Sequence, residues 1–380
     1  MREHRSVDGR DFLRQHQDAM VRDLGAFVER ESPSTDKVLL DQFAAFLAGY
    51  ASSAGGHAEI IPMRDAGNHV RISWGQVGEQ ACLLLLGHFD TVWPAGTLHE
   101  MPFRVENGVA TGPGIFDMKA GLVQGVWAVR ALRDVVGVDR PVVFLCNSDE
   151  EIGSPTSRPL IEQEAARAAA VFVLEPSDNG ALKTARKGVG IFHAELVGKP
   201  SHAGLDPFAG VSAIEELAHL ILDLHALSDP ETGTTVNVGV VSGGTRSNVV
   251  AANARAEIDL RVVTRAEAER MTQRILGWKP HHPEVEVRLS GGMNRPPMER
   301  TEKTAHLFHQ AQALAYDLGL DLEEALVGGG SDGNFCAVLG VPVLDGLGAV
   351  GGGAHARDEH VLIEAMPLRA ALVMRLLQTV

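Results

Sequence analysis

The hydrophobic positions of this chain follow two different patterns, with a change near Lys187. Before that residue, short runs that are apolar at every position alternate with segments of helical spacing, beginning with residues 11–30 and 37–50. The apolar runs include "ACLLLLG", "PVVFLC" and "AAVFVLEP". Strands that are apolar on both faces and alternate with helices are typical of a parallel sheet covered by helices on both sides. We therefore predict an α/β domain built on a largely parallel sheet.

After Lys187 the strand pattern alternates between apolar and polar positions. Segments such as "GVGIFHAELVG" and "ARAEIDLRVV" are interleaved with two amphipathic helices in the order β-α-β-β-α-β, which predicts a ferredoxin-like α+β domain with a one-sided antiparallel sheet. From about Pro296 the α/β pattern returns. We therefore predict a large domain formed by residues 1–187 and 296–380, with residues 188–295 inserted as a smaller domain.

Composition and charge narrow the class of protein. The chain has 380 residues, 45% of them hydrophobic, and a net charge of -15, which argues against nucleic-acid and anionic-membrane partners because these bind basic surfaces. The cysteines Cys82, Cys146 and Cys336 are too few for a disulfide framework, and the two that sit in apolar runs indicate buried thiols in a reducing compartment. The first twenty residues lack the apolar segment of a secretory signal, and no apolar run is long enough to span a membrane. These features predict a soluble, cytoplasmic protein.

Five segments of the large domain place metal-binding residue types just after a predicted strand. Each alone is more typical of a hydrogen-bonded structural group, but five at the strand ends of one parallel sheet indicate a ligand site. Mixed imidazole and carboxylate ligands suit zinc, manganese or cobalt better than calcium. The segments are "LLLLGHFDTV" with His88 and Asp90, "GPGIFDMKAG" with Asp117, "FLCNSDEE" with Glu150 and Glu151, "VFVLEPS" with Glu175, and "GLGAVGGGAHARDEH" with His355.

Adjacent acids in two of these segments suggest a division of roles. A hydrolytic metal site needs a base that is not itself a ligand, so Glu150 could accept a proton from water while Glu151 binds metal. Asp149, before them, is either solvated or caps the following turn. In the first segment, His88 could bind metal while Asp90 holds the other nitrogen of its imidazole.

The motifs "GHFDTV", "GPGIFDMKAG", "DEEIGS", "LEP", "SHAG" and "GGGAHARDEH" together resemble the M20 family of dinuclear metallopeptidases, and within it the glutamate carboxypeptidase (carboxypeptidase G) branch. The resemblance covers nearly the whole chain. It implies a zinc-exopeptidase-like catalytic domain with an inserted lid and dimerisation domain. It also implies two divalent metal ions, with zinc as the expected metal and cobalt or manganese as alternatives. The residues it implies as ligands are His88, Asp117 and Glu175 for one ion and Asp117, Glu151 and His355 for the other.

The resemblance carries further expectations about single residues. Glu150 is the implied base and Asp90 the implied partner of His88, and the peptide bond between Asp117 and Met118 is expected to be cis. In the inserted domain, His202 is implied to cross a dimer interface and to polarise the substrate carbonyl in the partner's active site.

Basic and amide side chains of the inserted domain are the expected substrate contacts. Asn248 and Arg261 match substrate positions of the family, and Arg295 is a further candidate for binding a carboxylate, which an Arg can hold through two parallel hydrogen bonds. Lys183, Arg186 and Lys187 fall near the family's other basic substrate position, without a choice among them, and each is more typical of a solvated surface residue than of a substrate contact.

Three functions remain open from the sequence. The first is a hydrolase that removes a C-terminal glutamate or similar residue from N-acyl amino acids or short peptides. The second is a deacylase acting on N-acetyl or N-succinyl amino acids, or a dipeptidase. The third is a metal-binding regulatory protein without catalysis, against which the intact Glu150 counts. A glutamate pocket needs a second cation, which Arg261 and Arg295 together could supply, and an Arg295 that points to solvent would favour the second function.

Overall fold

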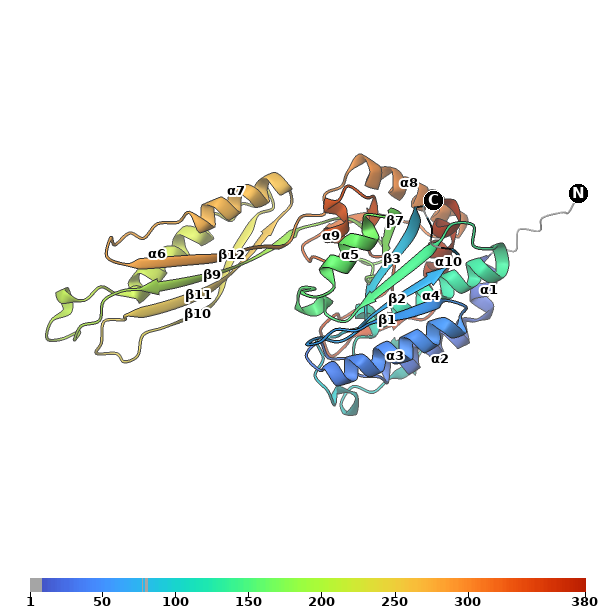
Figure 1. The fold of residues 1–380 in the computed structure, drawn as a ribbon, viewed down its shortest axis with the longest axis horizontal. Coiled ribbons are helices and arrows are strands. Elements are labelled where there is room, and N and C mark those ends of the chain that lie inside the picture. Colours follow the sequence, from blue (N-terminus) through green and yellow to red (C-terminus); the bar gives the residue numbers. More distant parts are fainter. Residues whose placement is uncertain (1–8, 77, 79–80) are drawn as a thin grey trace, which may run out of the picture. The chain divides into compact units, whose positions relative to one another are not determined.

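The computed structural model describes residues 9–76, 78 and 81–380, which divide into two compact units (Figure 1). Unit 1 comprises the described residues up to Thr184 together with Arg300–Leu326 and Ser331–Val380, and unit 2 comprises Ala185–Glu299 and Val327–Gly330. The start of the N-terminal stretch that was searched for a secretory signal lies outside the described residues.

The main sheet of unit 1 has six strands in the order β1-β2-β6-β3-β7-β14. Neighbouring strands from β6 to β14 run parallel, while β2 pairs antiparallel with both β1 and β6. The prediction of a largely parallel sheet is therefore confirmed. The strands are β1 His57–Ile61, β2 His69–Trp74, β3 Cys82–His88, β6 Val142–Asn147, β7 Ala168–Val173 and β14 Val343–Leu344.

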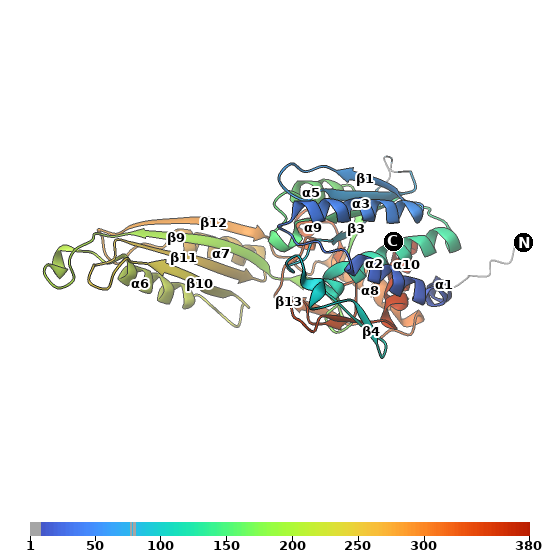
Figure 2. The ribbon, with the colours of Figure 1, turned by 90° about the horizontal axis from the view of Figure 1, so that it is seen from below.

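Helices lie on both faces of this sheet, as Figures 1 and 2 show. Every residue of β3 and β6 is buried between them, which explains why these strands are apolar at successive positions. The three cysteines are buried and unpaired, while burial was predicted only for the two that sit in apolar runs. The helices of unit 1 are α1 Gly9–Gln15, α2 Gln17–Val28, α3 Lys37–Ser53, α4 Ala120–Ala131, α5 Arg158–Ala165, α8 Glu302–Asp317, α9 Gly333–Val338 and α10 Ala365–Thr379.

The segment predicted as one helix over residues 11–30 is two helices, α1 and α2, which are separated at His16. The His16 Nδ1 atom lies 2.7 Å from the carbonyl oxygen of Phe12, which an unbroken helix would use for the amide of residue 16. That amide instead bonds to the carbonyl of Leu13. The side chain therefore competes with the helical hydrogen bond at this point.

The hydrophobic pattern did not predict two smaller sheets. One, in unit 1, has four antiparallel strands in the order β15-β16-β5-β4, and the other pairs β8 with β13, the two strands in which the chain passes from one unit to the other. Their strands are too short for an alternating pattern to be recognisable. They are β4 Arg104–Glu106, β5 Val109–Thr111, β8 Leu182–Arg186, β13 Glu324–Val327, β15 Gly351–Gly352 and β16 His360–Leu362.

Unit 2 is a four-stranded antiparallel sheet, ordered β10-β11-β9-β12, with two helices. Alternate residues of β9 and β11 are buried, and they form one core with the apolar side chains of both helices. The predicted β-α-β-β-α-β order is confirmed, and the last strand ends at Arg295. The elements are β9 Gly188–Val197, α6 Ala213–His225, β10 Thr235–Gly243, β11 Asn253–Val262, α7 Arg265–Leu276 and β12 Glu286–Arg295.

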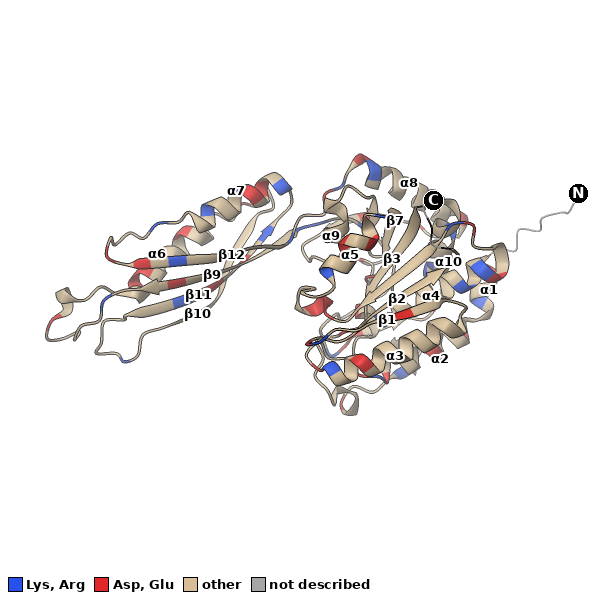
Figure 3. Ribbon diagram, in the orientation of Figure 1, with Lys and Arg blue, Asp and Glu red and all other residues tan. Residues whose placement is uncertain are grey.

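Charges of both signs are distributed over each unit (Figure 3). Several are paired, among them Lys37 with Asp41 and Arg71 with Glu164 in unit 1 and Arg270 with Glu267 in unit 2. Across the described residues, no helix combines the length and the apolar character that crossing a membrane requires.

Candidate metal centre

Three neighbouring strands of the main sheet deliver three of the predicted ligands to one edge. His88 is the last residue of β3, Glu151 lies in a short 3-10 helix after β6, and Glu175 follows β7 by two residues. Because β6, β3 and β7 are adjacent and parallel, their carboxyl ends meet at the same edge of the sheet.

The other two predicted ligands come from a different part of unit 1. Asp117 lies in a helical turn, Ile115–Lys119, a few residues after β5, and His355 follows β15. Both strands belong to the four-stranded sheet, so the expectation that all five segments end strands of one parallel sheet is wrong for these two. His355 has a φ of 60°, in the left-handed region that residues other than glycine rarely adopt. The peptide bond between Asp117 and Met118 is cis, as expected.

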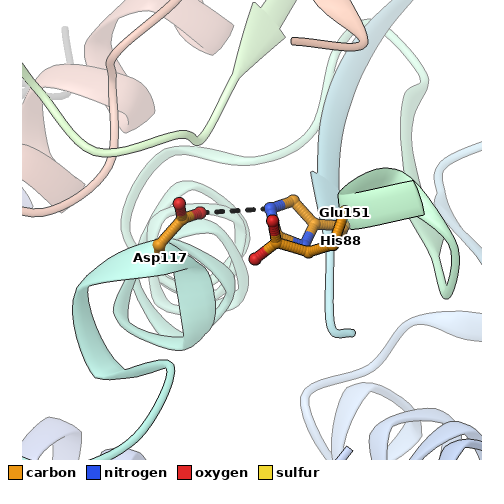
Figure 4. A group of neighbouring side chains, drawn as sticks. All are labelled: His88, Asp117 and Glu151. Atoms are coloured by element: carbon orange, nitrogen blue, oxygen red, sulfur yellow. Dashed lines mark hydrogen bonds and ion pairs between the residues drawn. The ribbon is translucent and has the colours of Figure 1, made fainter. Parts of the chain in front are cut away.

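The Asp117 carboxylate lies between two pairs of potential ligands. Its Oδ1 atom is 3.2 Å from His88 Nε2, and its Oδ2 atom is 3.3 Å from His355 Nε2. Glu175 Oε1 lies 3.4 Å from the same His88 nitrogen, and Glu151 Oε2 lies 3.2 Å from the same His355 nitrogen. Figure 4 shows Asp117 facing the ring of His88 with Glu151 beside it. Each oxygen of Asp117 therefore belongs to a different group of side chains.

Glu150 lies close to the first of these groups. Single potential ligand atoms of His88, Glu150 and Glu175 lie within 4.8 Å of one another, and the same holds for His88, Asp117 and Glu151. The structure thus brings together all five predicted ligands and the predicted base.

Asp90 supports both sides of the site and is fully buried. His88 Nδ1 lies 3.0 Å from the backbone carbonyl oxygen of Asp90 and 3.3 Å from its Oδ1 atom, and the backbone N–H groups of Glu150 and Glu151 each donate to its carboxylate at 3.1 Å. Asp90 therefore orients the imidazole and also fixes the turn that carries the two acids. Asp149 is buried as well and accepts the backbone N–H groups of Thr156 and Ser157, so it caps the following turn and is not solvated.

A further buried acid, Glu359, was not singled out from the sequence. Its carboxylate accepts hydrogen bonds from the backbone of the turn that carries Asp117 and from the indole of Trp93. Its neighbour Asp358 is exposed, and nothing in the local sequence distinguishes the two acids. The burial of Glu359 depends on its packing against Trp93 and the turn of Asp117, which are distant in sequence.

The electrostatics of the site reflect its crowded carboxylates. Hydrogen bonds to Asp117 and Glu151 raise the pKa of His355 to about 10. Burial by itself would lower the pKa of His88, but the carboxylates of Asp117, Asp90 and Glu175 raise it well above its usual range. Burial raises the pKa of Glu151. The negative potential that stabilises a proton on each imidazole would equally attract a divalent cation.

The donor set fits such cations. Within the described part of the chain, the buried Oε1 atom of Glu151 has no hydrogen-bond partner, and a buried carboxylate oxygen without a partner is costly unless it binds a cation. Two imidazoles and several carboxylates form a mixed set of nitrogen and oxygen ligands that suits zinc, cobalt or manganese.

In unit 2, the turn that carries His202 lies against the segment of Asn248. The backbone N–H of Ala203 donates to the Asn248 carbonyl at 3.0 Å, while His202 Nδ1 accepts the N–H groups of Gly204 and Leu205 at 3.1 Å each. These two predicted residues are therefore brought together just beyond the carboxyl end of β9.

Arg261 and Arg295 lie at the opposite end of this strand, because both pair with Val189 across the sheet. From Val189 to Val197 a strand spans about 27 Å at the usual rise per residue. Within one copy of unit 2, His202 and these two arginines are therefore far apart.

Three arginines converge on the Gly328–Gly330 segment of unit 2. Arg186 Nη1 donates to the carbonyls of Gly329 and Gly330 at 3.1 and 3.3 Å, and Arg261 Nη1 donates to Gly328 at 3.5 Å. The Cδ atom of Arg295 lies 2.8 Å from the position that a Cβ on Gly330 would occupy. Arg186, one of the three basic residues left open by the sequence, thus contacts the same segment as Arg261 and Arg295.

The arginines differ in their other partners. The guanidinium of Arg261 forms a fork with Asp259, through Nε to Oδ1 and Nη2 to Oδ2 at 2.9 Å each. Arg295 is 4% exposed and donates to Asn294 Oδ1 at 3.1 Å. Arg295 therefore does not point to solvent, whereas one edge of Arg261 is already occupied.

Comparison with known proteins relates this chain to a group of peptidases. Residues 84–379 match the sequence profile of peptidase family M20/M25/M40. Carboxypeptidase G2 of Pseudomonas sp. (strain RS-16) is 34% identical over 303 residues, which cover 78% of this chain and 73% of that protein. The succinyl-diaminopimelate desuccinylase of Halorhodospira halophila (strain DSM 244 / SL1) is 28% identical over 325 residues, which cover 80% of this chain and 85% of that protein.

A solved structure extends the likeness to the fold. Aminopeptidase PepT from Bacillus cereus matches with a TM-score of 0.76 and 21% identity, over 95% of this chain and 98% of that chain. At this level of identity the likeness concerns the fold alone.

Proposed function

Because the chain belongs to peptidase family M20/M25/M40, we propose that it is a dinuclear metal-dependent hydrolase that releases a C-terminal glutamate from N-acyl amino acids or short peptides. The observation that carries this proposal is the position of Asp117, whose two oxygens face His88 and His355 respectively. A carboxylate shared in this way is suited to bridge two cations. His88, Asp117 and Glu175 would hold one ion, and Asp117, Glu151 and His355 the other, with zinc as the expected metal and cobalt or manganese as alternatives.

Bound divalent ions would polarise the scissile carbonyl and make water a stronger acid. The side chains of the protein then provide proton transfer and orientation. Glu150 accepts a proton from the attacking water and delivers it to the leaving amine. Asp90 keeps His88 Nε2 directed into the site by holding its Nδ1 side, and it anchors the backbone of Glu150 and Glu151.

The preference for glutamate rests on the arginines of unit 2 and on the 34% identity with carboxypeptidase G2. A C-terminal glutamate carries two carboxylates, so its pocket needs more than one cationic group. Arg295, buried beside Gly330, and Arg186, which donates to Gly329 and Gly330, support such a pocket together with Arg261. Asn248, which lies beside His202 at the other end of β9, is the remaining proposed substrate contact and would act with His202 from the partner subunit.

A deacylase or dipeptidase activity is the alternative within the family. It is favoured by the fork between Arg261 and Asp259, because an arginine whose Nε edge is already paired has fewer donors for a substrate carboxylate. The similarity to a succinyl-diaminopimelate desuccinylase points in the same direction.

Cleavage of a substrate panel distinguishes these functions. The metal-stripped protein would be assayed for amine release before and after addition of zinc, with N-acyl-glutamates, N-acetylornithine, N-succinyl-diaminopimelate and β-alanyl-histidine as substrates. We expect zinc to restore cleavage with a preference for N-acyl-glutamates. Zinc-dependent cleavage of another substrate would keep the metal centre and reject the glutamate pocket. Two bound metals without any cleavage would favour the regulatory protein instead.

We also propose a homodimer formed through unit 2, with His202 acting in the active site of the partner. His202 lies about 27 Å along β9 from the level of Arg261 and Arg295, so one copy of unit 2 cannot bring all three to a dipeptide-sized substrate. On the same turn, Leu205 and Phe208 are 83% and 98% exposed, and a second subunit would cover them. The buried, unpaired cysteines suit a reducing compartment, and we propose the cytoplasm.

For His202→Ala we expect normal folding and metal content but a kcat lower by about 10²- to 10³-fold, as when one oxyanion-stabilising donor is removed. Mixed dimers of His202→Ala and Glu150→Gln subunits, isolated through two different affinity tags, test the arrangement across subunits. One of their two sites would combine an intact Glu150 with an intact His202, so activity should return. Mixed dimers that stay as inactive as both parents would reject a role of His202 in the partner's site.

A further inference from the structure

Glu359 is fully buried and accepts four hydrogen bonds from neutral donors. Its Oε1 atom accepts the backbone N–H groups of Phe116 and Asp117 at 2.9 and 3.0 Å. Its Oε2 atom accepts the N–H of Gly114 at 2.9 Å and the indole Nε1–H of Trp93 at 2.8 Å. Among the described residues, no Lys, Arg or His forms an ion pair with it. The carboxylate therefore uses its full acceptor capacity on positioning other groups.

Three of the four donors are backbone N–H groups of Gly114, Phe116 and Asp117, at the start of the turn Ile115–Lys119. Gly114, just before this turn, has a φ of 68°, and a Cβ there would lie 2.4 Å from Thr91 Cγ2. The backbone therefore adopts a conformation here that residues with a side chain do not favour. Fixing three amides of the turn at one carboxylate determines the direction in which the Asp117 side chain leaves the backbone.

The remaining contacts connect this turn to the other ligand segments. Trp93 lies three residues after Asp90, on the chain that leaves β3 beyond His88, and Glu359 itself lies four residues after His355. One carboxylate thus joins the segment of His88, the turn of Asp117 and the segment of His355, which are distant in sequence.

We infer that Glu359 is a positioning residue that sets Asp117 between the two groups of metal ligands and so fixes the geometry of both ion sites together. This inference rests on the proposed function, because it takes Asp117 as the bridging ligand. Glu359 does not contact the ions or the substrate in this role. It acts through the backbone of Asp117.

The chemistry of the four contacts explains why a glutamate is needed at this position. A glutamine has the same length but presents one carbonyl oxygen and one NH₂ group. Its NH₂ would face two N–H donors, either those of Phe116 and Asp117 or those of Gly114 and Trp93. An aspartate keeps all acceptors but has a shorter reach. Glu359→Gln should therefore disturb the turn more than Glu359→Asp.

Zinc titration of the metal-stripped full-length protein tests the inference. We expect Glu359→Gln to weaken zinc binding by about 10- to 100-fold, as is typical when a group that supports a metal ligand is replaced. With cobalt in place of zinc, its visible absorption should differ from that of the wild type, because the ligand geometry has changed. Glu359→Asp should lie between the two proteins in both measurements.

Glu216 provides the matched control in unit 2. It is 2% exposed and also holds backbone amides, those of His281 and His282 at 2.6 and 2.9 Å. Glu216→Gln should lower the melting temperature without changing zinc affinity or the cobalt spectrum. This contrast separates positioning of the metal ligands from general loss of stability.

The outcomes are distinguishable. Wild-type zinc affinity and an unchanged cobalt spectrum in Glu359→Gln would overturn the inference while leaving the proposed function intact. If Glu359→Gln does not fold, the same criteria apply to Glu359→Asp. A wild-type protein that binds no zinc, cobalt or manganese would overturn the proposed function and this inference together.

Discussion

In the Glu150→Gln variant we expect both metal ions to remain bound and kcat to fall by about 10²- to 10⁴-fold, the usual contribution of a general base. Glutamine preserves the size of the side chain, and its backbone N–H still donates to Asp90. What is lost is the capacity to accept a proton from water. Metal content by atomic absorption and steady-state kinetics on the best substrate of the panel would measure the two effects separately.

The adjacent acid supplies the control for this prediction. Glu151→Gln removes a carboxylate that faces His355 at 3.2 Å, so we expect it to lose one metal ion as well as activity. The assignment of base and ligand would be reversed if Glu150→Gln released metal and Glu151→Gln retained both ions.

For Asp117→Asn we expect loss of activity and weaker binding of both ions. The affinity for each ion should fall by more than the roughly 10- to 100-fold that is typical when a group supporting a metal ligand is replaced. The reason is that the two oxygens of Asp117 face His88 and His355 separately. An asparagine keeps one oxygen but replaces the other by an NH₂ group, which cannot bind a cation. Calorimetric zinc titration of the metal-stripped protein would measure both sites.

Variants of the outer ligands serve as controls, because each belongs to one group only. Glu175→Gln should weaken the ion beside His88 and spare the other, and His355→Gln should have the opposite selectivity. If Asp117→Asn weakened one ion only, the shared position of its carboxylate would not reflect a bridging role.

The part of the site that follows the main sheet could be predicted from the sequence. The runs that form β3, β6 and β7 are apolar throughout, and the polar residues just after them had to meet at one edge once the strands were parallel. Asp117 and His355 were also predicted as ligands but were assigned to the wrong sheet, because β5 and β15 are too short to show a period. The burial of Asp149 and Glu359 depends on packing between distant segments, which the local pattern does not contain.

In unit 2 the alternation of apolar residues predicted the strands and helices, but it did not predict which residues of neighbouring strands pair with one another. The placement of Arg261 and Arg295 at the level of Val189 depends on hydrogen-bond pairing between three strands. The distance between these arginines and His202 depends on that pairing as well. It therefore became visible only in the structure.

The discontinuity of unit 1 has a consequence for biosynthesis. His88, Asp117, Glu151 and Glu175 are all synthesised before unit 2, but His355 and Glu359 follow it, as do β14 and β16, which complete the sheets beside β7 and β5. A nascent chain can therefore form unit 2, a single internal segment apart from Val327–Gly330, while the metal centre still lacks one side of its ligands. If the proposed metal site is correct, an ion held by His355 can be bound only after the segment that carries this residue has been synthesised.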